Sequence, residues 1–178
     1  MKKNLVIFDG SNFYHGAKKL SPRTHLTNFK YRKLTEFLTK SKQNTIEYCV
    51  GEIRQHQYPS DKSKRLYANQ QALFYNLEKQ NIEIKKGYML RSNLAYHEKG
   101  VDVRIAIDIL RGALKNEYDY CYLISSDTDI MPAILDAIKE DKKIIYVGFE
   151  NFISRAMKIN CTKTILITRK MLRDYAGR

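Results

Sequence analysis

The stretch 120-YCYLISSDTDIMPAILDAI-138 contains a complete strand–turn–helix unit. Its first part, Tyr120–Ser125, is a short and nearly continuous apolar run, which is typical of a strand buried on both faces. Apolar residues then return at helical spacing, at Ile134, Leu135 and Ile138. Between the two patterns lie two carboxylates one residue apart, Asp127 and Asp129. The unit predicts a buried strand that ends in acidic residues and leads into a helix.

The same alternation runs along the whole chain. Runs of strand length are Asn4–Phe8, Thr45–Val50, Ile82–Gly87, Tyr120–Ser125, Lys143–Gly148 and Thr164–Ile167. Helical spacing lies between them, at Tyr31–Leu38, at Arg65–Lys79 with Leu66 among its apolar residues, and at Val103–Leu114. Apolar strands that alternate with helices predict an α/β fold, in which helices cover both faces of a mainly parallel sheet. Because no Ser/Gly-rich linker occurs, we expect one domain over residues 1–178, with its motifs in 1–150 and an unassigned basic extension at 151–178.

The charge balance points to a polyanionic partner. The 178 residues include 32 Lys and Arg against 19 Asp and Glu, a net charge of +13. Such an excess on a small domain favours nucleic acid, and lysine enrichment for solubility is the alternative. The apolar runs are too short to cross a bilayer, and the N-terminus lacks a signal pattern. The three cysteines form no C-x-x-C pair, so we expect neither a zinc site nor a disulfide framework, and a cytoplasmic location.

Four carboxylates follow or adjoin the ends of predicted elements. Asp9 directly follows the first strand, Asp102 begins a helix, and Asp127 and Asp129 follow the fourth strand. Parallel sheets gather functional residues at the carboxyl ends of their strands, so these acids are expected to share one edge. The alternative is a purely structural role for each acid. Asp9 can cap a helix, the charge of Asp102 can interact favourably with a helix dipole, and Ser126, Thr128 or Asp129 can cap the next helix.

Clustered carboxylates repel one another unless a cation lies among them. Oxygen ligands select a hard ion, Mg²⁺ or Mn²⁺, and such an ion acts on phosphate esters in hydrolytic enzymes. Asn12 offers an amide that could orient a carboxylate or a water molecule. Asp108 lies six residues after Asp102, which places it on a different helix face, and we expect it to be buried or to support the metal-binding acids.

The motifs 9-DGSN-12, 99-KGVDVRIAIDIL-110 and 124-ISSDTDIMPAI-134 resemble those of the NYN domain family, in its LabA-like branch, within the PIN-like nuclease superfamily. The resemblance implies a three-layer α/β/α domain and an RNA-cleaving enzyme that uses Mg²⁺ or Mn²⁺. It implies that Asp9, Asp102, Asp127 and Asp129 bind the metal and that Asn12 orients a ligand. Asp108 matches the second acid of its motif, and Ser126 and Thr128 are expected to support the acids.

RNA is the expected partner, and a small basic domain could also pair as a homodimer. The candidate RNA-binding residues are Lys99, Arg54, Lys62, Lys64 and Arg65, of which the last four belong to the segment Arg54–Arg65, predicted to be a mobile loop over the substrate.

Other functions remain open or are disfavoured. The sequence contains no G-x-G-x-x-G, P-loop or G-x-S-x-G motif, which disfavours dinucleotide, nucleotide-triphosphate and serine-hydrolase sites. An RNA-binding or protein-interaction module with the same fold and little nuclease activity is the main alternative. A structure-specific DNA nuclease of the same superfamily ranks below it.

Overall fold

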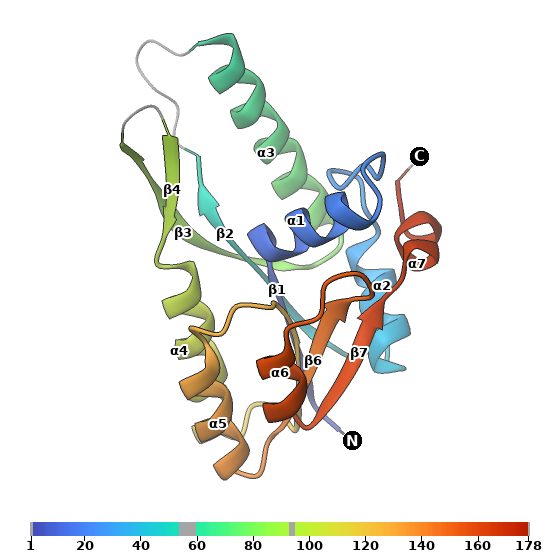
Figure 1. The fold of residues 1–178 in the computed structure, drawn as a ribbon, viewed down its shortest axis with the longest axis vertical. Helices are drawn as coiled ribbons and strands as arrows, with labels where there is room; N and C mark the ends of the chain where they lie inside the picture. Colours follow the sequence, from blue (N-terminus) through green and yellow to red (C-terminus); the bar gives the residue numbers. More distant parts are fainter. Residues whose placement is uncertain (1, 54–59, 93–94, 178) are drawn as a thin grey trace.

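The computed structural model describes residues 2–53, 60–92 and 95–177 (Figure 1). Within them, one sheet has the strand order β4-β3-β2-β1-β5-β6-β7. Five of its six strand pairs are parallel, and only β4 runs antiparallel to its neighbour β3. The strands are β1 Asn4–Asp9, β2 Thr45–Glu52, β3 Glu83–Ser92, β4 Ala95–Lys99, β5 Tyr120–Ile124, β6 Lys143–Phe149 and β7 Lys163–Ile167.

Helices cover both faces of this sheet and bury a separate core on each (Figure 1). They are α1 Gly10–Leu20, α2 Tyr31–Thr39, α3 Asp61–Lys79, α4 Val101–Leu114, α5 Met131–Lys139, α6 Arg155–Asn160 and α7 Arg169–Asp174. Phe13, Leu34, Phe74 and Leu172 bring α1, α2, α3 and α7 into one core, while Ile105, Ile134 and Met157 bring α4, α5 and α6 into the other. The predicted α/β/α sandwich with a mainly parallel sheet is confirmed.

The strand order places β1 between β2 and β5, and Phe8 is the register partner of Ile124. The chain therefore leaves β1 for one side of the sheet and later returns on the other side, next to β1. The carboxyl ends of β1 and β5 lie together at this reversal, which is where sheets of this kind form a crevice.

The segment from Asn151 onward contributes to both the sheet and the core. Its strand β7 pairs with β6 at the sheet edge. Leu172 of α7 is fully buried, and the α7 backbone carbonyl of Tyr175 accepts a hydrogen bond from the Lys30 amide. Within the described residues, no helix has both the length and the apolarity to cross a membrane.

The predicted loop Arg54–Arg65 is wrong over its last residues. Helix α3 begins at Asp61, so Lys62, Lys64 and Arg65 lie on a helix and not in a mobile loop. The side chain of Ser60 accepts a hydrogen bond from the Ser63 amide, and this cap starts the helix before its apolar pattern begins. Arg54 lies outside the described residues.

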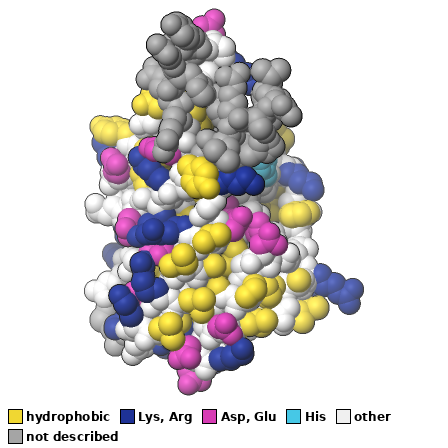
Figure 2. Space-filling view, turned by 90° about the vertical axis from the view of Figure 1, so that its left-hand side faces the viewer, with side chains coloured by type: hydrophobic (Ala, Val, Ile, Leu, Met, Phe, Trp, Pro, Cys, Tyr) yellow, Lys and Arg dark blue, Asp and Glu magenta, His cyan; other side chains and the backbone are white. Residues whose placement is uncertain are grey.

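On α4, part of the predicted apolar pattern faces outward. Val103, Ile107 and Leu114 are 63%, 49% and 69% exposed, whereas Ile105 and Ile109 are buried against the sheet. Hydrophobic side chains accordingly gather on the molecular surface over α4 and α5 (Figure 2). Because α4 carries apolar residues on several faces, the spacing of apolar residues in the sequence did not identify the face that packs against the sheet.

Candidate functional site

Asp9 is the best-anchored of the four carboxylates. It ends β1, is 1% exposed, and caps α1 by accepting a hydrogen bond at Oδ1 from the Asn12 amide, 3.0 Å away. Its Oδ2 accepts two more, from Asn12 Nδ2 at 2.7 Å and from Ser125 Oγ at 2.8 Å. Hydrogen bonds of this kind favour the charged form of a carboxyl group and fix its orientation. The local alternative of a helix cap is therefore correct for Asp9, but capping uses only one of its oxygen atoms.

Asn12 and Ser125 connect this anchor to the turn after β5. Asn12 Oδ1 accepts a hydrogen bond from the Ser126 amide at 3.2 Å, and Ser125 Oγ accepts one from the Asp127 amide at 3.1 Å. The Asn12–Ser126 contact and the Ser125–Asp9 contact each join segments more than a hundred residues apart in the sequence, and the Ser125–Asp127 contact continues them along the turn. They fix the position of the Asp127 backbone relative to Asp9.

Asp127 and Asp129 follow on this turn, and neither is buried. Asp127 Oδ1 accepts a hydrogen bond from the Asp129 amide at 2.9 Å, which forms a compact Asx turn. The local alternative, in which Ser126, Thr128 or Asp129 caps the following helix, does not hold, because α5 has Ile130 at its N-cap and no side-chain cap, with Pro132 in its first turn. Helix capping thus does not explain the acids of this turn.

The two hydroxyl residues predicted to support the acids differ in their surroundings. Ser126 Oγ lies 2.9 Å from the hydroxyl of Tyr146 on β6, which also accepts a hydrogen bond from the Ser154 amide at 3.0 Å. Thr128 is exposed, and its backbone carbonyl accepts a hydrogen bond from the Met131 amide. Ser126 therefore links the turn to β6, whereas the Thr128 side chain forms no hydrogen bond with a described residue.

Asp102 reaches the site from the first turn of α4. Gly100 precedes that turn with φ +79°, a conformation that glycine adopts without strain. Burial raises the pKa of Asp102, and the negative charges of Asp127, Asp9 and Asp129 raise it further, in that order. The structure therefore brings the four predicted carboxylates into one electrostatic environment, although they come from three separate segments.

Three of these carboxylates form no ion pair with a described basic residue. Within residues 2–53, 60–92 and 95–177, no Lys or Arg forms an ion pair with Asp102, Asp127 or Asp129. The donors are all oxygen atoms, and their mutual repulsion is the kind that a hard divalent cation relieves. In the described part of the chain, however, no group of three His, Cys, Asp or Glu side chains lies close enough together to hold one ion. The residues fit such a cation by their chemistry, and binding would require the side chains to approach one another.

Asp108 lies apart from this group, on the sheet side of α4. It is 3% exposed and pairs with Arg104 at 2.8 Å and with Arg111 at 2.5 Å. Its charge raises the pKa of Glu47 on β2, which shows that Asp108 faces the sheet. In this position the side chain holds two arginines of its own helix and does not contribute to the pKa shift of Asp102.

The basic candidates occupy two places. Lys99 is exposed at the end of β4, three residues before Asp102. Lys62, Lys64 and Arg65 are exposed on the first two turns of α3. Lys64 forms a loose ion pair with Asp61 at 3.7 Å, which is worth little at such an exposed position.

Two residues of the site were missed from the sequence, Ser125 and Tyr146. Ser125 is 2% exposed and contacts Asp9 because β5 lies beside β1, which the sequence does not reveal. Its place directly after the apolar run was the available signal. Tyr146 lies inside an apolar run and resembles any other core residue.

Comparison with known proteins agrees with the fold and identifies the family. No curated protein matches the sequence. A crystal structure from Vibrio parahaemolyticus, titled as a protein of unknown function, is similar with a TM-score of 0.67 at 17% identity, over 99% of this chain and 96% of that chain. At that identity the similarity shows the fold alone. The family model described as the NYN domain matches residues 3–168, which include every carboxylate discussed above. The chain therefore belongs to the NYN domain family.

Proposed function

We propose that this protein is a metal-dependent ribonuclease that hydrolyses RNA phosphodiester bonds at Asp9, Asp102, Asp127 and Asp129. The observation that carries the proposal is the hydrogen-bonded link, through Asn12 and Ser125, between Asp9 and the turn that bears Asp127. The charges of these acids and of Asp129, together with burial, raise the pKa of Asp102. An acidic centre of this kind in a chain of net charge +13 suits a polyanionic substrate, because the protein attracts the strand while a cation separates the phosphate from the acids. Membership of a nuclease-like family supports the same reaction.

The four carboxylates would hold Mg²⁺ or Mn²⁺ directly. When bound, such an ion supplies an activated water molecule and stabilises the negative charge that develops on the phosphate. Asn12 and Ser125 act by orientation, since their hydrogen bonds fix both oxygen atoms of Asp9. Lys99, which is exposed three residues before Asp102, would contact a phosphate of the strand.

Cleavage of labelled single-stranded and duplex RNA in the presence of Mn²⁺ or Mg²⁺ tests the proposal. Asp127→Asn should reduce the rate by at least about 100-fold, because the amide keeps the size of the side chain but removes its charge. Asp174→Asn is the matched control, since Asp174 is an exposed acid of α7. It should cleave RNA like the unchanged protein. Equal cleavage by the Asp127→Asn variant would point to a contaminating nuclease and reject the assignment.

One observation favours a second candidate function, an RNA-binding module with little or no nuclease activity. The described carboxylates are not arranged within reach of a single ion. Under this alternative the protein binds RNA, its affinity falls with salt, and no divalent ion supports cleavage. Isothermal titration with Mn²⁺ separates the two functions, because the nuclease should bind the ion in a manner that Asp127→Asn weakens and Asp174→Asn does not.

A further inference from the structure

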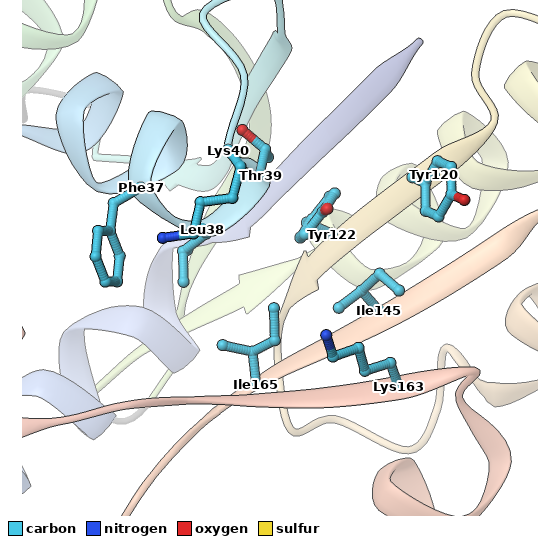
Figure 3. A pocket seen from close by; sticks show the side chains of 9 residues that line it. All are labelled: Phe37, Leu38, Thr39, Lys40, Tyr120, Tyr122, Ile145, Lys163 and Ile165. Atoms are coloured by element: carbon cyan, nitrogen blue, oxygen red, sulfur yellow. The ribbon is translucent and has the colours of Figure 1, made fainter. Parts of the chain in front are cut away.

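A hollow lies at the opposite edge of the sheet from the acids, where β5, β6 and β7 begin (Figure 3). Its volume is about 390 Å³, which is within the range of small-ligand sites. The sheet supplies its floor through Tyr122, Ile145 and Ile165, and the end of α2 supplies a wall at Phe37–Lys40. The hollow is thus separate from the acidic site, although β5 leads from one to the other.

The strand register places three different kinds of side chain in one row across this floor. Tyr122 of β5 is the partner of Ile145 of β6, and Ile145 is the partner of Lys163 of β7. An aromatic ring, an apolar side chain and an ammonium group therefore follow one another at the strand spacing of about 4.8 Å. In Figure 3 the Lys163 side chain extends over the floor toward Tyr122.

Tyr120 continues the aromatic surface two residues earlier on the same strand, and hence on the same face of the sheet. Lys2 Nζ donates a hydrogen bond to its hydroxyl at 2.9 Å and lies 4.8 Å from the ring centre. The contact holds the Tyr120 ring and adds a positive charge beside it. The hydroxyl of Tyr122 forms no hydrogen bond with a described residue.

The charge of the hollow has one sign. Lys40 and Lys163 line it, and none of the described residues that line it is acidic. Lys40 Nζ lies over the Phe37 ring at 3.9 Å from its centre, so an aromatic surface also accompanies the second lysine. A second hollow, which shares Tyr120 with this one, is lined by Asp119 and Asp141 together with Lys2 and Lys143.

We propose that this hollow binds a nucleotide of single-stranded RNA, with the base stacked on Tyr122 and the flanking phosphates held by Lys40 and Lys163. Stacking on aromatic rings beside lysines is how proteins hold single strands without reading their sequence. An acidic peptide would also meet the lysines, but it would have no base to stack on the Tyr122 ring. The identity of the strand rests on the proposed function, and the hollow then anchors the substrate away from the cleavage site.

The test is the fluorescence anisotropy of a labelled single-stranded RNA of about 20 nucleotides, measured without divalent ions. Tyr122→Leu keeps an apolar side chain but removes the ring, and it should weaken binding about tenfold. Tyr122→Phe keeps the ring and should bind within about twofold of the unchanged protein. Thermal unfolding of each variant shows that the fold is retained.

A charge-matched pair of variants tests the lysines. Lys40→Gln with Lys163→Gln removes two positive charges from the hollow, and Lys115→Gln with Lys158→Gln removes two exposed charges from α4 and α6 on the other face. The first pair should lower the slope of log affinity against log salt by about 1.4, at about 0.7 for each lost phosphate contact. The second pair should change it much less. Equal effects of the two pairs, or equal binding by Tyr122→Leu and Tyr122→Phe, would overturn the proposal.

Two further experiments distinguish an RNA strand from a free nucleotide, and this proposal from the ribonuclease proposal. Binding of uridine monophosphate should be much weaker than binding of the long RNA. If it binds as tightly, and if Tyr122→Leu abolishes that binding, the ligand is a free nucleotide and the proposal of an RNA strand is overturned. Cleavage of an RNA dinucleotide with Mn²⁺ should be unchanged in the hollow variants, because two nucleotides are too short to reach from the start of β5 to the turn beyond its end. If no variant cleaves but the anisotropy results hold, the ribonuclease proposal fails and the RNA anchor stands.

Discussion

Glu47 allows a quantitative test of the electrostatics around α4. The residue is 7% exposed, its Oε2 atom has no hydrogen-bond partner among the described residues, and Lys85 Nζ lies 3.8 Å from its other carboxylate oxygen. Burial raises the pKa of Glu47 to about 7, and the charge of Asp108 acts in the same direction. Of the remaining charges, Lys85 lowers the pKa, Glu83 raises it and Arg104 lowers it, in decreasing order of effect. The balance is unfavourable for the ionised carboxylate.

The size and sign of the effect follow from the two pKa values. Below the ordinary value of 4.5, Glu47 is protonated in both the folded and the unfolded state, and its ionisation has no effect on stability. As the pH rises from 4.5 to about 7, the unfolded chain releases the proton while the folded chain retains it, so stability falls. Above that window the full loss is about 3 kcal/mol, at about 1.4 kcal/mol for each pKa unit.

Replacing Glu47 by Gln removes this loss while keeping the shape of the side chain. The free energy of unfolding of Glu47→Gln should match that of the unchanged protein near pH 4 and exceed it by about 2 to 3 kcal/mol above pH 8. Urea unfolding at a series of pH values, followed by circular dichroism, measures the difference. Glu78→Gln makes the same chemical change at an exposed position of α3 and should show no comparable rise with pH. A difference for Glu47→Gln that stays constant, or that decreases as the pH rises, would refute the reasoning.

Three further substitutions test the site and the core. Asp102→Asn should raise the melting temperature in the absence of divalent ions, because it removes a charge that burial and three acids oppose, and it should abolish RNA cleavage. Ser125→Ala removes the buried donor to Asp9, and it should lower the free energy of unfolding by about 1 to 2 kcal/mol and reduce cleavage, measured by urea unfolding and the RNA assay. Gly16→Ala would place a methyl group 2.3 Å from the Phe149 ring, and calorimetry should show a loss of about 1 to 3 kcal/mol with metal binding retained.

The parallel sheet could be predicted because its strands are buried on both faces and hence continuously apolar. All six predicted runs overlap strands of the structure, including Tyr120–Ile124 and Lys143–Phe149. Strand β4 was missed, since Ala95–Lys99 contains charged and polar residues and no apolar run. It is an antiparallel edge strand, whose pairing depends on its neighbour β3 and not on burial from both sides.

Strand order was the information that the sequence did not contain. The acids were identified because each follows or adjoins the end of an element, but their supporting contacts depend on which strands are neighbours. Ser125 meets Asp9 only because β5 pairs with β1. Similarly, the row of Tyr122, Ile145 and Lys163 depends on the register of three strands that are separated in the chain by helices.

The two acids of α4 differ in the charges that surround them. Asp108 is buried, and the chain provides Arg104 and Arg111 to balance its charge. Asp102 begins the same helix, and there the surrounding charges are the acids Asp127, Asp9 and Asp129. No described Lys or Arg pairs with Asp102, although the chain has a net charge of +13. The uncompensated negative charge therefore lies at the first turn of α4. A divalent cation from solution would balance it.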